Sequence, residues 1–217
     1  MPNNLPALLP SIFLVMALGL LPFLVAMGTA FTKISIVLSL LRNALGLQQA
    51  PSTLVINSIA LTLTIFIMAP LGQSIAQQIA QADITSYDWD NLSKIFHIVN
   101  NTYKEYLNRY VSERELAFFM DAARKLWPPS LQDQITRTNM LILLPAHVTS
   151  EITRAFEIAF LLFLPFLVID MVVSNILLAM GAMMVSPMIV SLPIKILLFV
   201  ASDGWGRLIH NLVLSYI

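Results

Sequence analysis

Long stretches without a charged side chain constrain the fold of this chain more than any other feature. Residues 1–32, 43–82 and 171–194 contain no Asp, Glu, Lys or Arg. Each stretch exceeds the about 20 mainly apolar residues that a membrane-spanning helix needs. A fourth apolar tract, residues 140–169, is interrupted only by Glu151, Arg154 and Glu157. We therefore expect an all-α integral membrane protein with four hydrophobic segments, grouped as two plus two.

The composition excludes several classes of protein. Apolar residues make up 58% of the 217 residues and charged residues 11%, whereas soluble domains average about 45–50% and about 25%. Twelve basic residues balance twelve acidic ones, so there is no positive excess to bind a nucleic acid. The lack of cysteine rules out disulfides and thiolate chemistry. No basic residue precedes Lys33 and the first apolar stretch is longer than a signal-peptide core of about 7–15 residues, so we expect an uncleaved first segment.

Most of the charge lies in a central region, residues 83–137, with eight acidic and seven basic residues. Apolar residues at helical spacing predict an amphipathic helix from Leu92 to Tyr110 and a second one directly after it. Ser112 and Glu115 have the spacing of a capping box at the start of that second helix, and two prolines end it after Trp127. The region is therefore predicted to be a small soluble helical hairpin.

This hairpin separates two membrane regions, residues 1–82 and 138–217. Arg42 marks the short loop between the first two apolar segments. By the positive-inside rule that loop is cytoplasmic, which puts the insert on the periplasmic side.

Half of the twelve prolines lie inside the apolar segments. Each removes a helical hydrogen bond and tends to kink or break the helix. Lipid tolerates such breaks only where protein or water satisfies the freed backbone groups. We therefore expect broken helices in a tightly packed assembly. The six prolines are Pro22, Pro70, Pro145, Pro165, Pro187 and Pro193.

A few charged residues lie within the apolar segments, where a charge costs at least about 2.5–3.5 kcal/mol unless it is paired or hydrated. Glu151, Arg154 and Glu157 share one helical face by their spacing, and the arginine can reach both acids. These charges favour one of two roles, an ion or proton path or a set of structural ion pairs between packed helices. We favour the structural pairs, because both signs occur in equal numbers. The residues are Lys33, Glu151, Arg154, Glu157, Asp170 and Lys195.

Methionines cluster in the run from Leu177 to Pro187, where glycine, serine and proline lie between two apolar arms. The pattern predicts a re-entrant hairpin. Methionine is flexible and polarizable, so a ring of it could form a deformable hydrophobic constriction. Composition alone favours ordinary core filling instead, because the eleven methionines are spread over the whole chain.

Five motifs resemble, in order and spacing, those of one family. They are the loop LRNALGLQQAP at residues 41–51, Leu144-Pro145-Ala146 with Ser150-Glu151, the run from Leu164 to Asp170, Leu192-Pro193-Ile194-Lys195, and Phe199-Val200 followed by Asp203-Gly204-Trp205. That family is the type III secretion export apparatus protein called SctR in injectisomes and FliP in flagella. The resemblance covers nearly the whole chain and is weakest across the insert. The short insert and Ser186-Pro187 look more like an injectisome protein.

The resemblance implies a non-enzymatic subunit of an export gate in the bacterial inner membrane. It implies a homo-oligomer, a pentamer in this family, that joins the S and T export proteins, contacts the U and V proteins and membrane lipid, and passes unfolded secreted proteins. The family's methionine gasket falls on Ala182, Met183 and Met184, with alanine where the first methionine is usual. Its charged packing contacts fall on Glu151, Asp170 and Lys195. Its signature loop includes Arg42, Asn43, Gly46, Gln48 and Gln49.

Other functions have weaker support. His97, His147 and His210 lack a second ligand at metal spacing, and no phosphate-binding loop or nucleophilic-serine elbow occurs, so we expect no metal, no cofactor and no enzyme activity. The main alternative is an ion-coupled secondary transporter with Glu151, Asp170 and Lys195 as a relay. An intramembrane aspartic enzyme would have to use Asp170 and Asp203, and nothing around either suggests a substrate site.

Overall fold

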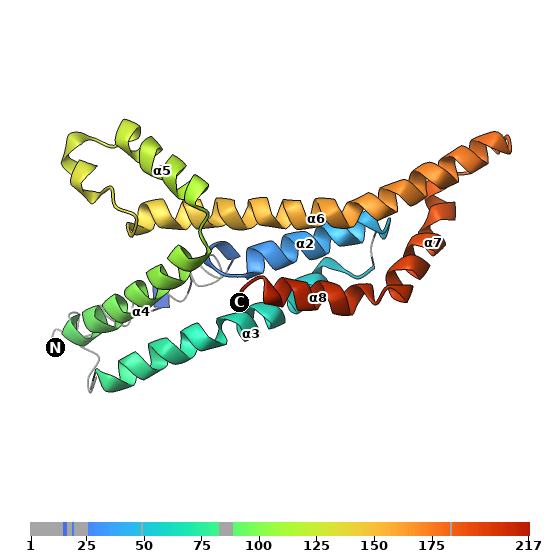
Figure 1. Ribbon diagram of the computed structural model, residues 1–217. Coiled ribbons are helices and arrows are strands. Elements are labelled where there is room, and N and C mark those ends of the chain that lie inside the picture. The colour runs from blue at the N-terminus through green and yellow to red at the C-terminus, as the bar shows by residue number, and fades with distance from the viewer. Residues whose placement is uncertain (1–14, 17–18, 20–25, 49, 83–88, 183) are drawn as a thin grey trace, which may run out of the picture. The chain divides into compact units, whose positions relative to one another are not determined.

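The computed structural model describes residues 15, 16, 19, 26–48, 50–82, 89–182 and 184–217. These parts of the chain are helical and contain no strand (Figure 1). The all-α prediction is thus confirmed. The elements in chain order are α2 (Phe31–Ala44), α3 (Thr53–Gln81), α4 (Trp89–Tyr110), α5 (Glu113–Leu126), the short 3-10 helix η1 (Pro129–Gln134), α6 (Met140–Ala179), α7 (Pro187–Ala201) and α8 (Gly204–Leu214).

The chain forms two compact units, each made of discontinuous pieces. The first contains Met1–Thr32 and Met68–Glu151, and the second contains Lys33–Ile67 and Ile152–Ile217. Their bounds cut across the three regions defined by the charge pattern, because α3 and α6 each continue from one unit into the other.

Within the described parts of the chain, two helices are long and apolar enough to cross a membrane, α3 and α6. A third span is possible if α7 and α8, which bend by 61° at their junction, count as one broken span. The predicted first segment lies mostly outside the described residues. The two predicted C-terminal segments are not separated where the sequence suggested, because α6 passes Asp170 without interruption and ends only at Ala179.

The prolines inside the described helices, including Pro193 of α7, do not break them, while Pro187 begins α7 and Pro22 lies outside the described residues. α3 continues through Pro70, and α6 continues through Pro145 and Pro165. The predicted breaks are therefore wrong at these positions. A proline removes one hydrogen bond, whereas a break in an apolar stretch would expose several backbone groups to surroundings that cannot bond them. Among the described residues of the apolar segments, the helices are interrupted instead at 29–30, 45–48, 50–52, 180–182, 184–186 and 202–203.

The core of the first unit brings together α4, α5 and the first turns of α6. Both helices of the predicted hairpin are present, and Met68 and Leu71 of α3 pack against the same core. The buried residues of this core are Tyr106, Leu107, Val111, Leu116, Ala123, Ile142, Leu143 and Ala146.

The predicted capping box at α5 does not form through its serine. The Ser112 side chain makes no capping hydrogen bond, and the Ser112 backbone N–H donates instead to Ser150 Oγ at 2.9 Å. On the surface, Arg137 bonds the Glu113 carboxylate and donates from Nε to Asn108 Oδ1 at 2.9 Å. The Arg137 bond lowers the pKa of the exposed Glu113 carboxyl.

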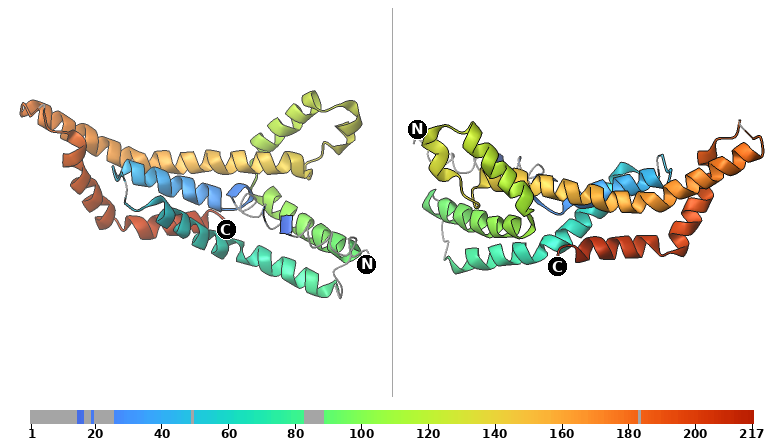
Figure 2. Two further views of the ribbon diagram at one scale, coloured as in Figure 1. Left: turned by 180° about the vertical axis from the view of Figure 1, so that it is seen from behind. Right: turned by 45° about the horizontal axis from the view of Figure 1, so that its top comes forward.

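The second unit buries one face of α2, whose inward residues recur every three or four positions from Lys33 to Ala44. α7 and α8 meet at the 61° corner, which Figure 2 shows from two further sides. Asp203 has a left-handed conformation there (φ 51°). The Phe199 ring lies edge-on to the Trp205 ring at 5.4 Å between centroids. This corner was not predicted from the sequence.

Candidate functional site

The methionine-rich run forms the turn between α6 and α7. Gly181 has a left-handed conformation (φ 72°) that glycine adopts without steric cost. The backbone N–H of Gly181 donates to the Leu178 carbonyl, and the N–H of Ala182 donates to the Leu177 carbonyl. These two bonds are those of a Schellman motif, which ends a helix by satisfying its last carbonyls. Pro187 then starts α7 at a position where a missing N–H costs nothing.

Two methionine side chains at this turn are exposed. Met184 is fully exposed and Met180 is 75% exposed, while Ala182 is half-buried. Met183, the middle residue of the predicted gasket, lies outside the described residues. Burying such open apolar side chains against lipid or another protein would be favourable.

A charged pair, Asp170 of α6 and Lys195 of α7, joins the two helices that meet at this turn. Lys195 Nζ lies 2.6 Å from Asp170 Oδ2 and also donates to the Ala44 carbonyl at 3.2 Å. Ser191 Oγ donates to the other carboxylate oxygen, Asp170 Oδ1, at 2.6 Å. Lys195 is buried, whereas 36% of the Asp170 side chain is exposed. Since Ala44 ends α2, Lys195 links its own helix, α7, to both α6 and α2.

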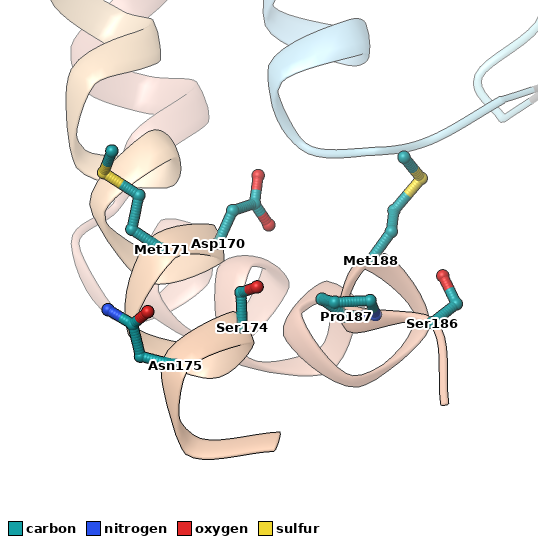
Figure 3. Close-up of a pocket in the computed structure, with 7 residues that line it drawn as sticks. All are labelled: Asp170, Met171, Ser174, Asn175, Ser186, Pro187 and Met188. Atoms are coloured by element: carbon teal, nitrogen blue, oxygen red, sulfur yellow. The ribbon is translucent and has the colours of Figure 1, made fainter. Parts of the chain in front are cut away.

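A pocket of about 580 Å³ opens beside this pair. Figure 3 shows the Asp170 carboxylate and the Ser174 hydroxyl on the side of α6 that faces the start of α7. Asn175, Met171 and the residues from Ser186 to Met188 complete the lining. Asp170 supplies the carboxylate of the pocket lining, and both of its oxygens already accept hydrogen bonds. The other lining residues are neutral, and some of them are apolar.

The signature loop lies against α7. Arg42 Nη1 donates to the Pro51 carbonyl at 3.3 Å and to Thr53 Oγ1 at 3.2 Å, which holds the two ends of the loop together. Gly46 has a positive φ of 77°, which explains glycine at this position. Gly46, Leu47 and Gln48 border a small pocket together with Met188, Ile189 and Leu192 of α7. Asn43 is exposed, and Gln49 lies outside the described residues.

The other predicted charges differ in how deeply they are buried. Lys33 is buried, and its Nζ lies 3.5 Å from the centroid of the Tyr216 ring, a cation–π contact. Glu151 is buried, Arg154 is half-buried and Glu157 is exposed, so these three residues do not share one environment.

Buried polar groups also gather in the first unit. His147, Ser150 and Glu151 are buried on α6, and the Tyr106 ring lies 5.8 Å from the His147 ring. Burial raises the pKa of the Tyr106 hydroxyl, and the nearby Glu151 charge adds to the shift. In the described parts of the chain, no group of three or more His, Cys, Asp and Glu side chains is placed to hold a metal ion.

Sequence reasoning missed several residues of these sites. Tyr216, Ser191 and the Ala44 carbonyl contact Lys33, Asp170 and Lys195, respectively, as described above. The only signal for them was indirect, since a lysine or aspartate in an apolar segment requires some partner. Hydroxyls and backbone carbonyls carry no pattern that identifies them as that partner.

Comparison with known proteins identifies the family. The FliP family profile matches residues 14–212. The chain is 45% identical to Yop proteins translocation protein R of Yersinia pestis over 213 residues, which is 98% of each chain. It is 43% identical to the hypersensitivity response secretion protein HrcR of Ralstonia nicotianae over 208 residues, 94% of this chain and 95% of the relative. It is 44% identical to the surface presentation of antigens protein SpaP of Salmonella typhi over 205 residues, 91% of each chain.

These relatives carry names of translocation and secretion rather than of catalysis. With a profile match over nearly its whole length and relatives above 40% identity, this chain belongs to the FliP family of type III secretion export-apparatus proteins, in its injectisome (SctR) branch.

Proposed function

We propose that this protein is a core subunit of the type III secretion export gate, and that the turn between α6 and α7 seals the conduit through which unfolded proteins pass. The observation that carries the proposal is the exposure of Met184 and Met180 at the end of a hairpin of two apolar helices. A ring of such side chains from several copies would exclude water and ions, yet bend aside for a passing chain.

The assembly that we propose contains several copies, five by family resemblance, joined to the S and T export proteins and contacting U and V. It lies in the bacterial inner membrane with the α4–α5 hairpin on the periplasmic side. Supporting it, α6 and α7 leave many large apolar side chains uncovered, such as Phe160, Leu161, Ile189 and Leu197. A helix in this state requires lipid or protein around it.

In this proposal the buried charges hold helices together. The Lys195 ammonium is bonded to Asp170 and to the Ala44 carbonyl, and Asp170 is also bonded by Ser191. A carboxylate whose two oxygens are both occupied is poorly placed to pass protons on. The geometry therefore favours a structural pair that fixes the two arms of the hairpin over the relay of an ion-coupled transporter.

The test replaces both methionines of the turn. Met183→Ala with Met184→Ala shortens two side chains of the proposed seal, so the conduit should leak ions. We expect the ion conductance of membranes containing the assembled complex to rise by about an order of magnitude, because a hydrophobic constriction gates by dewetting. The amount of assembled complex should not change, since the Met184 side chain is fully exposed and adds nothing to the fold of the chain itself.

A matched control removes two exposed methionines elsewhere. Met16 and Met27 are 66% and 50% exposed, and neither lies at the turn or in a pocket described above. Met16→Ala with Met27→Ala should leave the conductance unchanged. Wild-type conductance of the Met183/Met184 variant in a fully assembled complex would rule out the turn as the seal.

A further inference from the structure

The helical insert, residues 83–137, contacts the first unit close to each of the three points at which the chain passes from one unit to the other. These points lie at residues 32–33, 67–68 and 151–152. All of the contacts described below lie within the first unit. Each one is made by α4, by the link between α4 and α5, or by the core that these helices share with α6.

The first contact is a hydrogen bond to the backbone before α2. Tyr103 Oη donates to the Gly28 carbonyl at 2.8 Å, across 75 residues of sequence. Residues 26–28 are helical, and α2 begins at Phe31 after a break at 29–30. A Cβ on Gly28 would overlap Tyr103 Oη and lie 2.9 Å from Cζ. Glycine is therefore required here for the close approach of the tyrosine.

The second contact lies one residue before the crossing in α6. The Ser112 backbone N–H, between α4 and α5, donates to Ser150 Oγ at 2.9 Å. The same hydroxyl donates to the Ala146 carbonyl at 2.7 Å. Ser150 is buried. Its hydroxyl therefore acts as both a hydrogen-bond acceptor and a donor in a place that water does not reach.

The third contact is apolar. Met68, the first residue of α3 in this unit, packs against the core cluster that contains Tyr106 and Leu107. The α4–α5 pair and its core therefore contact all three connections on the side that belongs to the first unit.

The Tyr103 hydroxyl is held in place by its neighbours. The Tyr103 ring stacks on Tyr106, with ring planes 12° apart and centroids 6.2 Å apart. Burial raises the pKa of Tyr103 to about 12, so the hydroxyl keeps its proton and stays a donor. Tyr106 lies three residues further along the same helix, and its buried hydroxyl has no hydrogen-bond partner among the described residues.

We propose that Tyr103 is a positioning residue of the export gate: its bond to Gly28 makes the insert a clamp on the three chain connections, so that an event at the insert reaches α2 and α6. The functional part of this inference rests on the proposed export-gate role. The bond itself is tested separately, by hydrogen exchange, so the two can fail independently.

The experiment compares two hydroxyl deletions in the assembled complex. Tyr103→Phe removes the bond to Gly28, whereas Tyr106→Phe removes a hydroxyl of the same type that makes no bond. We expect amide exchange in residues 29–35 to become about five- to tenfold faster in Tyr103→Phe, the effect of losing one net hydrogen bond. It should stay at the wild-type rate in Tyr106→Phe. Protein export should fall in Tyr103→Phe alone, at equal amounts of complex.

A rescue separates the clamp from a general loss of stability. Gly28→Ala alone should speed exchange in the same segment, because its methyl overlaps the tyrosine oxygen. Adding Tyr103→Phe removes that oxygen and should bring the exchange of Gly28→Ala back toward the Tyr103→Phe rate. Unchanged exchange in Tyr103→Phe, an equal rise in both tyrosine variants, or no rescue would overturn the clamp. Faster exchange with normal export would overturn the positioning role.

Discussion

At the scale of single residues, the Asp170–Lys195 pair is asymmetric in a way that can be measured. Only 4% of the Lys195 side chain is exposed, against 36% of Asp170. A buried charge that loses its partner is costly, about 3–5 kcal/mol, whereas a partly hydrated one recovers much of that energy from water. The two partners should therefore differ when each is removed alone.

We expect Asp170→Asn to destabilise the complex by about 3 kcal/mol, because it leaves the Lys195 ammonium buried beside a neutral amide. Lys195→Met should cost less, since the remaining carboxylate is partly in water. The lost bond to Ala44 adds about 1 kcal/mol to that variant but does not reverse the order. Denaturant unfolding of the detergent-solubilised complex measures both values, and a larger loss in Lys195→Met would contradict the asymmetry.

The sequence indicated that Asp170 and Lys195 need partners, because each charge lies in or beside an apolar stretch. It could not show that they pair with each other. They are 25 residues apart and belong to different helices, so their pairing depends on the angle at which the chain turns back after Gly181. The same holds for Lys33 and Tyr216, which lie at opposite ends of the sequence.

At the scale of elements, periodicity predicted the helices of the insert well, since α4 and α5 each show an apolar stripe on a polar background. It was less informative for α6, where nearly every residue is apolar and no stripe marks the ends. The prolines were misleading for a related reason: in a long apolar helix, a bend costs less than a break. The turn at Gly181 was predictable, because glycine, serine and proline mark it.

The corner between α7 and α8 gives a prediction at this scale. A Cβ on Gly204 would overlap the Phe199 ring, which is itself packed against Trp205. Gly204→Ala should therefore destabilise the complex by about 1–3 kcal/mol, as overpacking does. A Cβ on Gly206 would meet only the end of the Asp203 side chain, at 2.7 Å. That carboxylate can turn away, so Gly206→Ala should change stability by less than about 1 kcal/mol.

Thermal unfolding of the two glycine variants, each in the assembled complex, tests the corner. We expect the two melting temperatures to differ only if the Phe199 ring cannot move aside. Similar melting temperatures for Gly204→Ala and Gly206→Ala would mean that the ring moves aside and that the corner is not rigid.

At the scale of the whole molecule, the dominant fact is how little of its apolar surface this chain covers by itself. In the most apolar part of α3 and of α6, only 17% of the residues are buried. Large side chains such as Phe156, Phe160 and Val168 are more than half exposed along α6. Lipid covers such surface on a simple span. In the proposed gate, neighbouring copies and partner proteins would cover part of it, including the methionine turn.

We therefore expect native mass spectrometry to find this chain in a multi-copy complex. The chain would be expressed with its candidate S and T partners and extracted in mild detergent. A species with several copies of this chain and both partners would fit a conduit, because one copy can line only part of a ring around a passing polypeptide. A monomer or dimer without partners, together with proton movement that depends on Asp170, would contradict the gate. In that case the Lys195–Asp170 pair would have to open during transport, and the exposed methionines would have to face lipid.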